Sequence, residues 1–135
     1  MVNFMKYSYG YLATLFSVIF LDLLWLSMTM KSIYQKHLSH ILAPEPTWWA
    51  AIAFYLLYAF GLYFVVIRPQ EIDNKSLLNI FILGFVFGLT AYGTYDLTNQ
   101  ATIKDWPFFI TVIDLLYGAL LSGIAAMAGA WVIRK

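Results

Sequence analysis

The sequence predicts an all-α integral membrane protein: a bundle of four transmembrane helices with a short amphipathic surface helix in the first loop. Three observations predict this fold. Of the 135 residues, 62% are hydrophobic, against about 45–50% in soluble domains. Only 11% are charged, too few for the surface of a water-soluble domain, where about 25% is usual. The apolar residues also form four blocks, each long enough for the roughly 20 residues that cross a hydrocarbon core.

The four blocks are expected to be helices, because a chain in lipid must satisfy its own backbone hydrogen bonds and none of the blocks alternates like a barrel strand. The expected helices span about 9–30, 48–67, 77–97 and 107–133. They form one membrane domain, residues 1–135. Pro46 and Thr47 precede the second helix, Asp73 precedes the third and Pro107 starts the fourth, which are usual residues at helix starts.

The first block, residues 9–30, is longer than the apolar part of a signal peptide, about 7–15 residues. It also contains Asp22, and we expect it to be a retained helix. The loop after it, residues 31–43, has apolar residues on one helical face and polar residues on the other. This pattern predicts an amphipathic helix on the membrane surface. A connector folded over the bundle is the alternative.

Positive residues predict the orientation, because loops rich in Lys and Arg stay in the cytoplasm. The N-tail, the second loop and the C-tail hold five, and the first and third loops hold three. Both termini are therefore predicted in the cytoplasm, with a dual topology as the alternative. The net charge of +1 gives no electrostatic reason for a nucleic-acid partner. Membrane lipids are the expected surroundings.

Small residues four positions apart predict that the third and fourth helices form the tightest pair, since such residues let helix backbones approach closely. Gly84 and Gly88 form one such pair in the third helix. Gly118 and Gly123 belong to overlapping pairs in the fourth helix. A homo-oligomer formed through these four glycines is the alternative.

Acidic residues inside the predicted helices indicate a functional site. Asp22 lies within the first helix, Asp96 at the end of the third and Asp114 about two turns into the fourth. An acid at a helix centre costs about 2.5–3.5 kcal/mol of insertion free energy, so such residues usually face a bundle interior or a wet cavity. The predicted topology puts all three in the outer half of the membrane. We therefore expect an aromatic-lined polar pocket that opens to the outer side.

Helical spacing adds aromatic and polar neighbours to the three acids. The predicted pocket residues are Asp22, Trp25, Tyr92, Asp96, Asn99, Asp114 and Tyr117. Asp22 and Asp114 are the expected central pair, close enough to share a proton, a cation or water. Alternatively, each acid only bonds a neighbouring helix and fixes the packing. Asp22-Leu-Leu-Trp25 and Asp114-Leu-Leu-Tyr117 also echo each other in helices of opposite direction, as in an inverted repeat.

A carboxylate among aromatic rings can hold a cation or a proton. The first functional hypothesis is therefore binding or transport of a small polar or cationic solute. The alternatives are a lipid-active enzyme or its accessory, and a structural subunit that binds a partner protein. His37 and His40, the only histidines, lack a third ligand, so no metal or cofactor is predicted. Phosphate-loop and hydrolase motifs are absent, which leaves enzymatic activity open but favours a non-enzymatic role.

Three stretches carry a resemblance to a known family. They are Asp22-Leu-Leu-Trp-Leu26, Tyr92-Gly-Thr-Tyr-Asp-Leu-Thr-Asn99 and Thr111-Val-Ile-Asp-Leu-Leu-Tyr-Gly118. The chain resembles, over almost its whole length, the small bacterial membrane proteins grouped as "domain of unknown function 2177". The resemblance implies four helices in a bacterial inner membrane and implies no activity. Tyr117 stands where Trp is common in that family.

Overall fold

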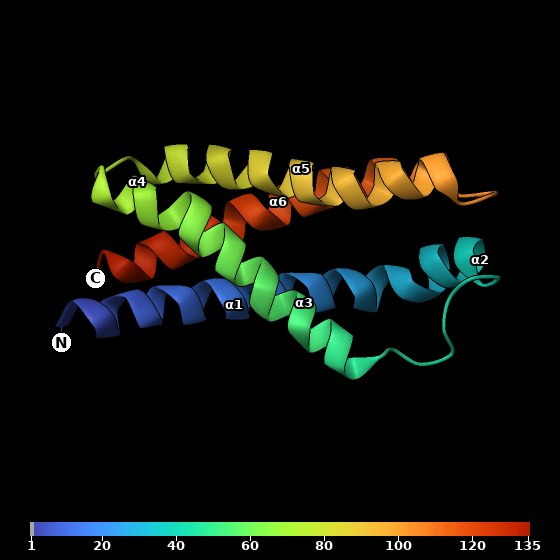
Figure 1. Ribbon diagram of the computed structural model, residues 1–135, viewed down its shortest axis with the longest axis horizontal. Helices are drawn as coiled ribbons and strands as arrows, with labels where there is room; N and C mark the ends of the chain where they lie inside the picture. Colours follow the sequence, from blue (N-terminus) through green and yellow to red (C-terminus); the bar gives the residue numbers. More distant parts are fainter. Residues whose placement is uncertain (1) are drawn as a thin grey trace.

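The computed structural model describes residues 2–135, most of which are helical (Figure 1). Four helical rods are long and apolar enough to cross a membrane. The candidate membrane spans in these rods are Phe4–Leu38, Trp48–Ile72, Leu77–Thr102 and Phe108–Ile133. Within residues 2–135 there is no strand. The predicted class, an all-helical protein with four potential membrane spans, is confirmed.

The first two rods each contain a short π-helix that joins two α-helices. The first rod consists of α1 (Val2–Thr29), η1 (Met30–Tyr34) and α2 (Gln35–Leu38). The second rod consists of α3 (Trp48–Gly61), η2 (Leu62–Ile67) and α4 (Arg68–Ile72). The third and fourth rods are the uninterrupted helices α5 (Leu77–Thr102) and α6 (Phe108–Ile133). A π-helix inserts an extra residue into a turn and often marks a functional position in a helix.

The helix predicted in the first loop is present, but it continues the first rod instead of lying apart on the membrane surface. Leu38 is buried and packs with Trp106 and Ile110 at the junction of α5 and α6. Ile33 and Tyr34 pack against the same cluster. The part of the apolar face formed by Ile33, Tyr34 and Leu38 is therefore covered by protein, which corresponds to the alternative of a connector folded over the bundle, whereas Ile41 is exposed.

Helices α5 and α6 form the most extensive contact in the bundle, as their small residues predict. A Cβ atom at Gly84 would lie 2.8 Å from the Cβ of Ala126 and 2.8 Å from the carbonyl oxygen of Ser122. A Cβ atom at Gly88 would collide with Gly118 and Ser122. Only glycine allows this close approach of the two backbones. These contacts lie within one chain, and an association of copies through the same glycines stays a prediction.

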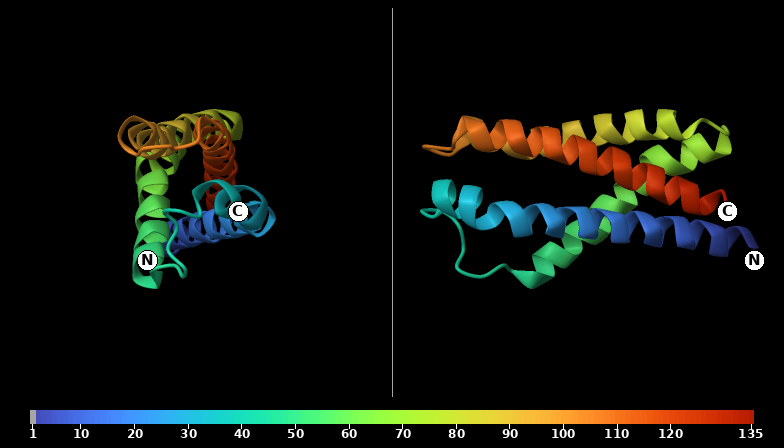
Figure 2. Two further views of the ribbon diagram at one scale, coloured as in Figure 1. Left: turned by 90° about the vertical axis from the view of Figure 1, so that its right-hand side faces the viewer. Right: turned by 180° about the vertical axis from the view of Figure 1, so that it is seen from behind.

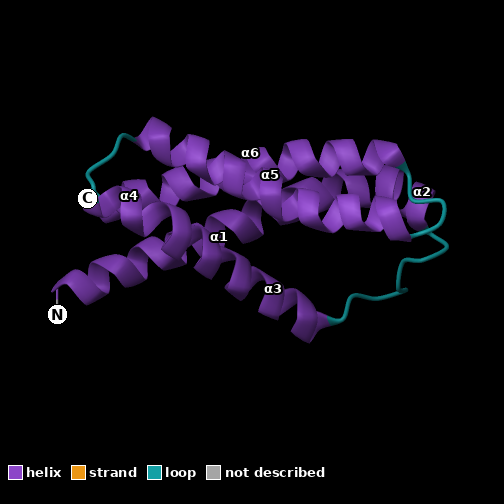
Figure 3. Cartoon of the chain, turned by 45° about the horizontal axis from the view of Figure 1, so that its top comes forward, coloured by secondary structure: helices purple, strands orange, loops and turns teal. Residues whose placement is uncertain are grey.

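The second rod crosses the bundle obliquely (Figures 1 and 2). Its first part, α3, packs mainly on α1, and the two helices cross each other (Figure 3). Its continuation η2 packs on α5 and α6. We call the end of the bundle with residues 39–47 and 103–107 the loop end, and the opposite end, where α1 starts and α6 finishes, the terminal end. Toward the loop end, α3 diverges from α5 and α6.

The apolar core lies mostly toward the terminal end, where η2 enters the bundle. Its buried residues are Val18, Leu62, Tyr63, Val66, Ile67, Ile80, Leu121, Ala125, Ala126, Ala130 and Ile133. An ion pair closes this end, since Arg134 lies 2.6 Å from Glu71. The three intramembrane acids lie on the other side of this core, in the half where α3 has left α5 and α6.

Candidate functional site

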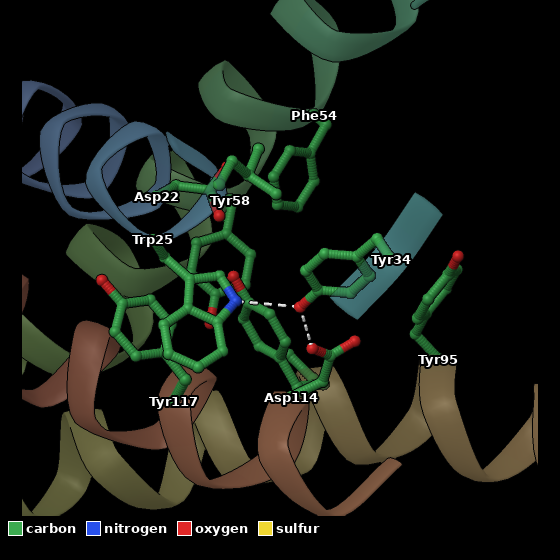
Figure 4. A pocket seen from close by; sticks show the side chains of 11 residues that line it. Asp22, Trp25, Tyr34, Phe54, Tyr58, Tyr95, Asp114 and Tyr117 are labelled. Carbon is green, nitrogen blue, oxygen red and sulfur yellow. Dashed lines mark hydrogen bonds between the residues drawn. The ribbon is translucent and has the colours of Figure 1, made fainter. Parts of the chain in front are cut away.

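A cavity of about 480 Å³ occupies the loop half of the bundle, where α3 diverges from its neighbours (Figure 4). Residues from all four rods line it. They are Asp22, Trp25 and Leu26 of α1, Tyr34 of η1, Phe54 and Tyr58 of α3, Ala91, Tyr92 and Tyr95 of α5, and Asp114 and Tyr117 of α6. Seven of these residues are aromatic, two are acidic and none is basic. The cavity is thus an aromatic box that contains carboxyl groups.

A chain of hydrogen bonds holds Asp114 at the wall of the cavity (Figure 4). The Trp25 Nε1–H donates to the Tyr34 hydroxyl over 2.8 Å. That hydroxyl in turn donates to Oδ1 of Asp114. The Trp25 ring stacks on the Tyr117 ring, with 4.2 Å between centroids and 14° between planes. The first rod and α6 are therefore joined at the site by both polar and aromatic contacts.

Asp96 lies fully buried beside Asp114. The two carboxyl groups are close neighbours and influence each other electrostatically. Among the described residues, no N–H or hydroxyl group donates to either carboxyl oxygen of Asp96. Two carboxyl groups can form a hydrogen bond only when one of them carries a proton. Asp96 and Asp114 are therefore neighbouring buried acids, which can share a proton when one of the two is protonated.

The expected central pair, Asp22 and Asp114, is not the pair in contact. Both residues line the cavity, but the carboxyl group that meets Asp114 is that of Asp96. The reason is geometric. Asp96 and Asp114 stand on α5 and α6, whose glycines bring the two backbones closest together, whereas Asp22 stands on α1 across the cavity.

Asp22 has its own partner on α3. The Tyr55 hydroxyl donates to Oδ2 of Asp22 over 2.5 Å. About one turn further along α3, the Tyr58 hydroxyl lies 2.6 Å from Oγ of Ser122 on α6. These two tyrosines tie α3 to α1 and to α6 at the level of the cavity, and they hold the aromatic wall of α3 in place.

Comparison with known proteins agrees with this architecture. The chain matches the family described as "Predicted membrane protein (DUF2177)" over residues 7–131. It belongs to this family. Searches among curated proteins and among solved structures found no match. The protein is thus a multi-pass membrane protein of a family of unknown function, as the resemblance of its motifs indicated. Every residue that lines the cavity lies within the matched range.

The predicted site residues fall into three groups in this member of the DUF2177 family. Five of them line the cavity, namely Asp22, Trp25, Tyr92, Asp114 and Tyr117. Asp96 does not line it but contacts Asp114 directly. Asn99 lies about one turn beyond Asp96 toward the loop end and is not part of the lining. The two equivalent aromatic residues of the internal echo, Trp25 and Tyr117, stack on each other.

A ring of hydrogen bonds closes the loop end beyond the cavity. The Trp106 Nε1–H donates to the Thr111 hydroxyl over 3.1 Å, and that hydroxyl donates to Oε1 of Gln100 over 3.0 Å. The Gln100 side-chain N–H donates back to the carbonyl oxygen of Trp106 over 3.0 Å. These bonds fix the turn between α5 and α6. Within residues 2–135, His, Asp and Glu side chains do not gather into a set of three that could hold a metal ion.

Four tyrosines of the site were not predicted from the sequence: Tyr34, Tyr55, Tyr58 and Tyr95. Tyr34 follows Trp25 by nine residues, which is about 2.5 turns of a regular α-helix and places the two on opposite faces. The π-helix η1 changes the helical phase between them. The available signal for Tyr34 was its place on the apolar face of residues 31–43. For Tyr55 and Tyr58 no local signal separates them from the other aromatic residues of an apolar helix.

Gly118 has a specific role in the shape of the cavity. A Cβ atom at this position would collide with the ring of Tyr92. Without one, the Tyr92 ring lies against the backbone of α6, where it also meets the Tyr58 ring edge-on at 5.9 Å. The glycine therefore sets the position of one aromatic wall.

Proposed function

We propose that the protein binds a small organic cation in the cavity and moves it across the membrane, coupled to protons. One observation carries the proposal: seven aromatic rings and two carboxyl groups line a single cavity that has no basic residue in its lining. A cavity of about 480 Å³ falls in the range of small-molecule sites, about 300–1,000 Å³.

The chemistry of the lining selects for positive charge. The face of an aromatic ring attracts a cation with about 0.5–2 kcal/mol, and more strongly where water is excluded. A cation in a membrane interior also needs a negative partner, because a bare charge in low dielectric is costly. Asp22 and Asp114 supply that partner from two sides of the cavity. An anion would find no cationic side chain in the lining, so it is disfavoured.

The pair of acids supports a role for protons. Asp114 faces the cavity, and the buried carboxyl group of Asp96 lies next to it. A cation beside Asp114 favours loss of a proton from the two acids, whereas an empty cavity favours its retention. Cation and proton therefore compete for the same carboxyl groups, and this competition is the coupling that an exchange of one for the other requires.

The proposed location is the bacterial inner membrane with both termini in the cytoplasm. The distribution of Lys and Arg supports this orientation, since five of the eight lie in the N-tail, the second loop and the C-tail. In this orientation the cavity lies in the outer half of the bilayer, and a solute reaches it from the outer side.

The test is binding of permanently charged probes to the purified chain in lipid nanodiscs. Tetramethylammonium and tetraethylammonium are compared with neutral probes of the same shape by calorimetry. We expect the cations alone to bind, and Asp22→Asn to weaken their binding at least about tenfold, which corresponds to about 1.4 kcal/mol. The matched control is Glu45→Gln, which removes an exposed acid in the first loop outside the cavity.

The transport step is tested separately, in liposomes loaded with a pH-sensitive dye. Addition of a cation that binds should release protons from liposomes that contain the wild-type chain, and Asp114→Asn should abolish that release. If no cation binds, or if Asp22→Asn and Glu45→Gln behave alike, the binding proposal is wrong. If cations bind but no proton moves, only the transport step is wrong.

A further inference from the structure

A second cavity of about 500 Å³ lies near the terminal end, between the first turns of α1 and the second rod. None of its lining residues belongs to the first cavity. Its walls are largely aromatic and apolar, and no acidic residue lines it. Leu12, Phe60 and Phe64 of its lining are 42%, 50% and 42% exposed. Because the rods that carry them span the membrane, this terminal groove faces lipid.

Arg68 is the cation of the terminal groove. Its guanidinium lies over the rings of Tyr7 and Phe64, 5.9 Å and 5.3 Å from their centroids. The nearby acid Glu71 is engaged by Arg134, and within residues 2–135 Arg68 forms no ion pair. A cation–π contact holds the guanidinium near the rings and leaves its N–H groups free to donate. The groove therefore presents a cationic donor without an anion.

Tyr63 is a second donor without a partner. Its side chain is only 3% exposed and lines the groove. Its hydroxyl finds no hydrogen-bond partner among the described residues. Buried polar groups are nearly always hydrogen-bonded, so an unpartnered one indicates a missing acceptor. Tyr63 and Arg68 line the same groove, and each carries a donor group that has no acceptor oxygen among the described residues.

We propose that the terminal groove binds an anionic glycerophospholipid, with one acyl chain along the apolar wall and the phosphate at Arg68. Arg68 starts the last short helix of the second rod, at the level where basic residues near helix ends meet lipid headgroups. The Tyr63 hydroxyl donates to a phosphate or ester oxygen of the same lipid. The absence of an acid from the lining leaves an ammonium or choline group without a partner, which favours phosphatidylglycerol over phosphatidylcholine. This site is independent of the proposed cation cavity.

The test is native mass spectrometry of the full chain in detergent, with phosphatidylglycerol and phosphatidylcholine of identical acyl chains. We expect the wild type to prefer phosphatidylglycerol about fivefold, as one Arg at a headgroup provides. Arg68→Gln should abolish this preference. The matched control Lys75→Gln removes an exposed cation at the same end but outside the groove, and it should keep the preference.

Two further variants test the placement of the lipid without changing charge. Tyr63→Phe should weaken binding of both lipids, because both carry a phosphate. Leu12→Trp should also weaken both, because it fills the acyl part of the groove. Helix content measured by circular dichroism identifies any variant that fails to fold.

Four outcomes overturn the proposal. The first is an equal effect of Arg68→Gln and Lys75→Gln, which would indicate general surface charge. The second is competition by inorganic phosphate or glycerol phosphate at the lipid's own concentration, which would indicate a site for free anions. The third is a dimer that Leu12→Trp dissociates, which would place a second copy in the groove. The fourth is unchanged lipid binding in both Tyr63→Phe and Leu12→Trp.

Discussion

Removal of the Tyr34 hydroxyl tests whether the network at Asp114 stabilises the bundle. Tyr34→Phe deletes the acceptor of the Trp25 N–H and the donor to Asp114 at the same time. A hydrogen bond between membrane helices contributes about 0.6 kcal/mol on average and about 1.7 kcal/mol at most. Two such bonds, one of them to a carboxyl group, predict a loss of about 1–3 kcal/mol. The assay is unfolding in mixed micelles on titration with sodium dodecyl sulfate, followed by circular dichroism.

The control for this prediction is Tyr9→Phe. Tyr9 lies on α1 and is 55% exposed, so the same deletion should change the free energy of unfolding by less than about 0.5 kcal/mol. A double-mutant cycle of Tyr34→Phe with Asp114→Asn isolates the bond between the two residues. Equal effects of Tyr34→Phe and Tyr9→Phe, together with additive effects in the cycle, would refute the reasoning.

Three further predictions concern packing, protons and orientation. Gly84→Ala should destabilise the bundle by about 1–3 kcal/mol, because its Cβ atom would lie 2.8 Å from that of Ala126. The control Gly93→Ala, whose Cβ atom would have no contact closer than 3.8 Å, should be neutral or stabilising by up to about 1 kcal/mol. Equal losses of stability in the unfolding assay would contradict this prediction. Binding of tetraethylammonium should weaken as the pH falls, because protons neutralise the carboxyl groups that attract the cation. A dissociation constant independent of pH between about 3 and about 7, a range that includes the ordinary Asp pKa of about 3.9, would contradict it. Since the chain has no cysteine, His40→Cys and Lys135→Cys give single labels, and an impermeant thiol reagent added to intact cells should react only with the first; reaction of both would indicate dual topology.

The fold class follows from the sequence because it depends on local properties. The length and hydropathy of a segment determine whether it can span a bilayer, and neither quantity requires a partner. The close contact of α5 and α6 can likewise be predicted from the spacing of small residues such as Gly84 and Gly88, because the absence of a side chain permits the approach of the backbones. The end of the first rod was harder to predict. Residues 31–38 contain no Gly or Pro that would end the helix, and the packing of Leu38 on Trp106 stabilises its continuation.

The acids of the site were also found from sequence, because an acid within an apolar helix is costly wherever it lies. Asp22 and Asp114 line one cavity, and Asp96 lies in contact with Asp114. Their aromatic neighbours Trp25 and Tyr117 followed from helical spacing alone. These residues share one property: residue type and spacing within about one turn of their own helix are enough to single them out.

Only the tertiary structure decided which acids form a pair and which tyrosines complete the site. The contact of Asp96 with Asp114 depends on how closely α5 approaches α6 at one level, and helical spacing within either helix does not contain that distance. The bond from Tyr34 to Asp114 joins residues 80 positions apart across a change of helical phase in η1. Tyr55 was one of 21 Tyr and Phe residues, and its bond to Asp22 exists only because α3 crosses α1 there. A sequence records what each helix can present, whereas the angles and phases at which helices meet arise from the packing of the whole bundle.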